Sequence, residues 1–72
     1  MKGETKEHRF QRIAQRRVQR VLDSLRSLSQ TSNKRMYQWN EPQMKKIWSV
    51  IERELKLCRE SFAEDEEKEF RL

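Results

Sequence analysis

The sequence predicts an all-α protein in which two helices form an antiparallel hairpin and two hairpins dimerise into a four-helix bundle. Apolar residues recur with spacings of three and four along residues 5–29 and from residue 41 to at least 62, as they do on amphipathic helices. Charged residues make up 40% of the 72-residue chain, which is typical of long charged helices. The chain has only one Gly and one Pro, the residues that most often mark turns, so few turns are expected.

The first expected helix, residues 5–29, has an apolar seam that is wider than one partner helix covers. Its members are Phe10, Ile13, Ala14, Val18, Val21, Leu22, Leu25 and Leu28. They occupy about half of the helix circumference, which indicates contact with two or more neighbouring helices, as in a four-helix bundle. Arg17 lies within this arc. It either snorkels from the edge of the seam or pairs with an acid, for which Glu54 is the first candidate.

Four arginines form a narrow stripe on the opposite side of the same helix, and we call Arg9, Arg12, Arg16 and Arg20 the arginine stripe. At 100° per residue the stripe spans only about 80° of the circumference. Asp23 is the only acidic residue that the periodicity places on this face. Like charges at this spacing destabilise a helix, whereas guanidinium groups bind phosphate in a bidentate manner. The stripe therefore predicts a surface for a polyanion or an acidic protein, and the alternative is an ordinary solvated face.

The segment between the helices, residues 30–40, is basic at its start and aromatic at its end. Ser32 and Asn33 can turn or cap the backbone through side-chain hydrogen bonds. One interpretation joins Lys34, Arg35, Tyr37 and Trp39 into a basic and aromatic loop that stacks unpaired bases beside phosphate contacts. The alternative folds Tyr37 and Trp39 under the loop as a lid on the end of the bundle.

The second expected helix begins at residue 41 with a strong start signal. Asn40 is a good N-cap, Pro42 suits the first turn, and Gln43 is placed to complete a capping box. Trp39 and Met44 then occupy the two positions of a hydrophobic staple, which gives Trp39 a structural role.

Two apolar lines run along the second helix. The main seam predicts a packed face on which Cys58 is a small core residue, and it consists of Met44, Ile47, Trp48, Ile51, Leu55, Cys58 and Phe62. Val50 and Leu57 form a separate line, seven residues apart. A lone hairpin of this size buries little core, so a dimer is expected. The predicted partner-interface residues are Phe10, Leu22, Val50 and Leu57.

The chain is expected to consist of a helical-hairpin domain, residues 1–62, and an acidic tail, residues 63–72. Its charge is also uneven between the two halves. Residues 1–35 have ten Lys/Arg against three acids, and residues 36–72 have seven against nine. The tail contains five acids and is either a solubilising extension or a segment that folds onto the arginine stripe.

Several function classes have no support in the sequence. There is no paired-acid, Cys/His or Ser/His arrangement, no Gly-rich phosphate loop and no metal-ligand cluster, so neither catalysis nor a cofactor is expected. No apolar run is long enough to span a membrane, and the charged N-terminus lacks a signal-peptide core. The single cysteine cannot form an internal disulfide, which suits a cytoplasmic location.

A set of short motifs links the two helices. They are Leu25-Arg26, Ser32-Asn33-Lys34, the aromatic pair Tyr37 and Trp39, Lys46-Ile47, Glu54-Leu55 and Phe62. In this order they resemble a group of small helical-hairpin proteins of bacterial, phage and plasmid origin. This chain has Leu28-Ser29-Gln30 where the group has Leu-Gly-Asn, and Trp39 where the group has Tyr. The group has no settled activity, so the resemblance implies a helical hairpin from a mobile element and no mechanism.

Together these patterns predict a small nucleic-acid-binding protein, such as a regulator from a mobile element, that contacts RNA or DNA phosphates through the arginine stripe. The alternative is a protein-interaction module, such as a small subunit or an inhibitor, that binds an acidic protein surface.

Overall fold

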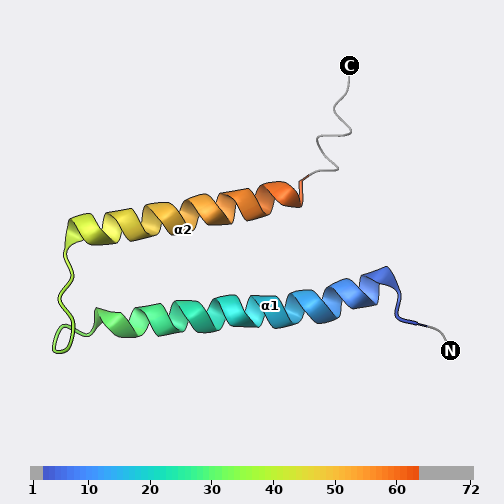
Figure 1. The fold of residues 1–72 in the computed structure, drawn as a ribbon, viewed down its shortest axis with the longest axis horizontal. Helices are drawn as coiled ribbons and strands as arrows, with labels where there is room; N and C mark the ends of the chain where they lie inside the picture. Colours follow the sequence, from blue (N-terminus) through green and yellow to red (C-terminus); the bar gives the residue numbers. More distant parts are fainter. Residues whose placement is uncertain (1–2, 64–72) are drawn as a thin grey trace, which may run out of the picture. The chain divides into compact units, whose positions relative to one another are not determined.

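The computed structural model describes residues 3–63, and these residues form two α-helices and a 3-10 turn without any β-strand (Figure 1). Helix α1 comprises Lys6–Ser29, the 3-10 turn η1 comprises Gln30–Ser32, and helix α2 comprises Glu41–Ser61. The chain divides between Gln38 and Trp39 into two units, one around each helix. The predicted all-α class is confirmed for the described residues. The single domain of residues 1–62, the antiparallel pairing and the dimer stay predictions.

Helix α1 begins one residue later than expected because Thr5 acts as its N-cap. The Thr5 hydroxyl accepts a hydrogen bond from the backbone N–H of His8 at 3.0 Å, and the Thr5 carbonyl accepts from Arg9 N–H at 3.0 Å. Glu7 in the first turn and Arg26 in the last turn complement the helix dipole. These local interactions fix the start of the helix that carries the arginine stripe.

Helix α1 ends without the glycine that commonly terminates helices. It tightens instead into η1, where the Ser29 hydroxyl donates to the carbonyl of Arg26 at 2.8 Å and the Thr31 hydroxyl donates to that of Leu28 at 2.7 Å. These hydroxyl groups add a second donor to carbonyls at the end of the helix that also accept from the backbone N–H of Gln30. The Ser29-Gln30 step in place of Gly-Asn is therefore compatible with a defined helix end.

Asn33 organises the turn that follows. Its side-chain oxygen accepts from the backbone N–H of Arg35 at 3.0 Å, and its carbonyl accepts from those of Met36 at 3.2 Å and Tyr37 at 2.9 Å. The predicted turn-forming role of Asn33 is confirmed. Residues 33–37 are consequently a hydrogen-bonded turn rather than a plain spacer.

The predicted start of α2 is confirmed in detail. Asn40 Oδ1 accepts from the backbone N–H of Gln43 at 2.8 Å, and Gln43 Oε1 accepts from that of Asn40 at 3.0 Å, which completes the capping box. Trp39 and Met44, the two staple positions, are both half-buried. The helix ends at Ser61, one residue before the expected minimum, and Phe62 is its C-cap.

No described residue is buried, and the apolar seams remain largely exposed. Ile13, Ala14 and Leu28 on α1 are half-buried, as are Met44, Ile47 and Ile51 on α2. Each unit contains a single α-helix, so its seam has no second helix of the same unit to pack against. For the same reason Cys58 is exposed, and its prediction as a core residue is wrong for the described chain.

Candidate nucleic-acid interface

The positive charge of the chain is concentrated on α1. This helix contains seven Lys/Arg and two acidic residues, whereas α2 contains five and four. The difference arises from the polar face of α1, where cations follow one another at helical spacing. A surface of one sign over several turns attracts a polyanion more strongly than a mixed surface does.

Arg12 is the one member of the arginine stripe with an acidic partner among residues 3–63. Its Nε and Nη2 atoms donate to the two carboxylate oxygens of Glu4 at 2.8 and 2.9 Å. Glu4 precedes α1 and lies eight residues from Arg12, so helical periodicity does not place it on this face. The expectation that Asp23 alone balances the stripe is therefore wrong.

The Glu4–Arg12 pair changes the acid–base properties of both groups. The hydrogen bonds from Arg12, with a smaller contribution from its charge, lower the pKa of the Glu4 carboxyl below its ordinary value. The same hydrogen bonds, together with the charge of Glu4, raise the pKa of the Arg12 guanidinium. The side chains are 52% and 33% exposed, so water screens the attraction, and the pair can exchange for another anion.

The other three members of the stripe, Arg9, Arg16 and Arg20, are exposed and have no acidic partner among residues 3–63. Asp23 does not neutralise them, because its Oδ1 accepts from Gln19 Nε2 at 3.0 Å and from Arg26 Nη1 at 3.3 Å. Three guanidinium groups on one side of one helix are thus available to an external anion. The sequence predicts four such groups, and the Glu4–Arg12 pair reduces those without an acidic partner among residues 3–63 to three.

The predicted loop residues Lys34, Arg35 and Tyr37 are all exposed in the turn after η1. They belong to the same unit as the stripe, but Arg20 lies nine residues before the end of α1, about 13 Å along the helix axis. The structure therefore places them beyond the end of α1 and does not join them to the stripe. Tyr37 is 48% exposed, whereas Trp39 is half-buried.

The predicted partner-interface residues are exposed apolar side chains. Phe10 and Leu22 on α1 are 56% and 41% exposed, and Val50 and Leu57 on α2 are 61% and 51% exposed. Their exposure satisfies the first requirement for an interface, which is accessibility to a partner.

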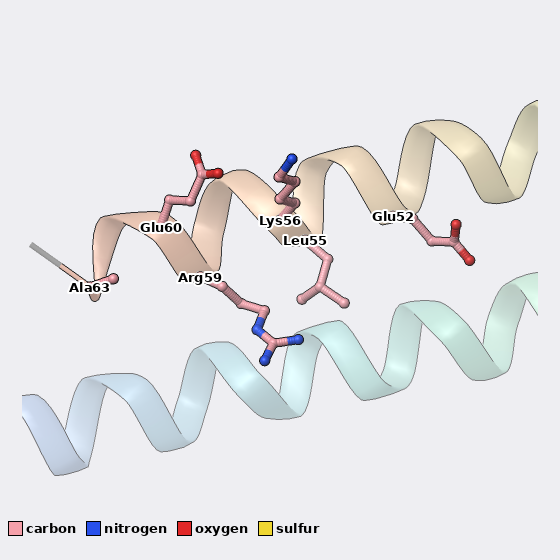
Figure 2. Close-up of a pocket in the computed structure, with 6 residues that line it drawn as sticks. All are labelled: Glu52, Leu55, Lys56, Arg59, Glu60 and Ala63. Atoms are coloured by element: carbon pink, nitrogen blue, oxygen red, sulfur yellow. The ribbon is translucent and has the colours of Figure 1, made fainter. Parts of the chain in front are cut away.

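The C-terminal half of α2 has a mixed surface and contrasts with the stripe. A shallow, open hollow there is lined by Glu52, Leu55, Lys56, Arg59, Glu60 and Ala63 (Figure 2). Lys56 and Glu60 point to one side of the helix, whereas Leu55 and Arg59 point to the other. Two acids and two bases line this hollow, so it offers no concentrated charge for an anion.

Residues 3–63 show neither of two further classes of site. No group of three or more His, Cys, Asp or Glu side chains is arranged to hold a metal ion in this part of the chain. Neither described helix is long and apolar enough to cross a membrane. The acidic tail, apart from Ala63, lies outside the described residues.

No protein-family model, no curated protein and no solved structure matches this chain. The resemblance to small hairpin proteins of mobile elements consequently stays a prediction.

Proposed function

We propose that this protein binds nucleic acid and contacts its phosphate groups through the arginine stripe. The observation that supports this most strongly is the exposure of Arg9, Arg16 and Arg20 without acidic partners in the described chain. Clustered like charges destabilise a helix, and a bound polyanion offsets that repulsion. Arginine also presents a planar fork of donors that matches two phosphate oxygens.

The dimensions of the stripe favour contact with a nucleic-acid backbone. Arg9 and Arg20 are separated by about 16 Å along the helix axis, and Arg16 and Arg20 by about 6 Å. A row of this length on one side of a helix can follow several successive phosphates. Such contacts fix position and carry little sequence information, so we propose recognition by shape and charge.

Direct reading of base edges is a smaller part of the proposal. Gln15 and Gln19 flank the stripe and have the side chain that best pairs with adenine in a groove. The amide nitrogen of Gln19 already donates to Asp23 at 3.0 Å, however, so a base contact would have to break that bond. Both RNA and DNA fit a surface that reads phosphates.

The functional unit that we propose is a dimer of antiparallel hairpins. The wide seam of α1 and the two apolar lines of α2 need more covering than one helix supplies. Val50 and Leu57 would contact the second copy, and Arg17 would pair with Glu54 where the two seams meet. A dimer would present two arginine stripes and so raise the affinity for one long polyanion.

The setting that suits such a protein is the cytoplasm, where it would regulate the replication or expression of a mobile element. Support for this part comes from the resemblance of its Ser32-Asn33-Lys34 and aromatic-pair motifs to small phage and plasmid proteins.

The test is a titration of the purified chain against 20-base-pair RNA and DNA duplexes at low and moderate salt. We expect affinity for at least one duplex to fall steeply with salt and to fall further in the variant R16A/R20A. The matched control is R53A/R59A, which removes the same charge from α2 and should retain most of the affinity. Equal losses in the two variants would contradict a role for the stripe.

The second candidate function is that of a protein-interaction module, and the same titration distinguishes it from nucleic-acid binding. The exposed apolar side chains of Val50 and Leu57 favour it. Absence of binding to both duplexes at low salt would make the stripe a contact for an acidic protein, and a binding partner would then be sought by affinity capture.

A further inference from the structure

The segment before α1 places a carboxylate directly on the arginine stripe. Glu4 lies next to the N-cap Thr5, and its carboxylate reaches two turns along the helix to Arg12. Both carboxylate oxygens are used, at 2.8 and 2.9 Å from Nε and Nη2. This is the bidentate geometry in which a guanidinium group also binds a phosphate.

Occupation of this edge of Arg12 restricts what else can bind there. A phosphate that approaches the Nε–Nη2 edge must displace the carboxylate. A phosphate that approaches the remaining Nη1 side lies beside a negative charge. In both cases Glu4 opposes phosphate binding at the one stripe member that it touches.

We infer that Glu4 is an intramolecular competitor of phosphate at Arg12 and thereby a determinant of ligand specificity. The inference rests on the proposed function of the arginine stripe. The carboxylate is tethered to Arg12 through a short segment, so its effective concentration is high compared with that of a free anion. A polyanion already held by Arg9, Arg16 or Arg20 has a comparable advantage, because its next phosphate is also tethered.

The consequence is discrimination by the number of phosphates. An isolated phosphate lacks the additional contacts that compensate for displacing Glu4, whereas a continuous backbone has them. The pair is exposed to water, so displacement is reversible and its effect on affinity is moderate. Glu4 therefore adjusts the binding strength of the stripe without blocking it.

The experiment compares Glu4→Gln with Glu7→Gln by titration against the same 20-base-pair duplex in one salt concentration. Both variants remove one negative charge near the start of α1, but only the first releases Arg12. We expect Glu4→Gln to bind about two- to fivefold more tightly than Glu7→Gln, the range for an exposed ion pair. Circular dichroism establishes that both variants keep the helix content of the parent.

A second comparison separates release of Arg12 from a general charge effect. In the Arg12→Ala background, replacing Glu4 by Gln should change affinity no more than replacing Glu7 does. Equal affinities of the two single variants, with binding retained by the parent chain, would overturn the competitor role and leave the proposed function intact. If the parent chain fails to bind, or binds but loses no affinity in R16A/R20A, the proposed function and this inference both fail.

Discussion

Asp23 pairs with Arg26 at 3.3 Å and not with Arg20, although both arginines are three residues away from it. In this pair the acid is N-terminal to its basic partner, the order that suits the helix dipole better than the reverse. Gln19 contacts the same carboxylate oxygen at 3.0 Å. Asp23, the one acid on the polar face of α1, thus contacts Arg26 near the end of the helix. It does not pair with Arg16 or Arg20, which stay accessible to an external anion.

The capping box predicts a measurable loss when it is broken. Asn40→Ala removes the acceptor for the Gln43 N–H, which lies 2.8 Å from Asn40 Oδ1. We expect the free energy of unfolding of α2 to fall by about 1 kcal/mol, the usual effect of losing such a cap. Thermal unfolding followed by circular dichroism measures it. Ser49→Ala, in the middle of α2, is the control and should cause little loss; equal effects of the two changes would argue against the cap.

The Glu4–Arg12 pair predicts a pH dependence at acidic pH. Because the pKa of Glu4 is lowered in the folded chain, the pair stabilises the start of α1 above the ordinary carboxyl pKa. This stabilisation is lost as the pH falls through the lowered pKa and is unchanged near neutrality. An NMR titration of the Glu4 carboxyl carbon reports the pKa directly. Arg12→Ala should return it toward the ordinary value and Arg53→Ala should not, and an unchanged pKa in Arg12→Ala would disprove the pairing.

The proposed dimer depends on the second apolar line of α2. Replacing Val50 and Leu57 together by Asp would place two charges in the interface, where desolvation opposes them. We expect sedimentation equilibrium to show a dimer for the parent chain and a dissociation constant at least about tenfold higher for V50D/L57D. Ser49→Asp adds one charge to the polar side of the same helix and should leave the dimer intact. A monomeric parent chain at high concentration would refute the dimer.

The features that the sequence predicts well are those that depend on neighbouring residues. Helical periodicity and the Asn40–Gln43 signal locate α1 and α2 to within one residue at each start, because caps and amphipathic spacing act over a few residues. The stripe follows from the same periodicity. The Asn33 turn is also local, and its side-chain hydrogen bond was predictable from residue type.

Other features lie beyond such reasoning. Glu4 reaches Arg12 from outside the helix, where no periodicity applies, so its contact required the structure. The end of α1 has no glycine, and the hydroxyls of Ser29 and Thr31 donate hydrogen bonds to carbonyls there. Many serines and threonines can form such bonds, so these two residue types did not predict where the helix ends. The burial expected for Cys58 requires a second helix packed against it. The spacing of apolar residues indicates that a partner is needed but does not identify the partner.

Phosphate binding by the arginine stripe is tested most directly by the salt dependence of affinity for the duplex, RNA or DNA, that the chain binds more tightly. Each phosphate neutralised contributes about 0.9 to the slope of log affinity against log salt. If Arg16 and Arg20 each contact one phosphate, the slope for R16A/R20A should be shallower than that of the parent by about two. A slope identical to that of the parent chain would contradict the account.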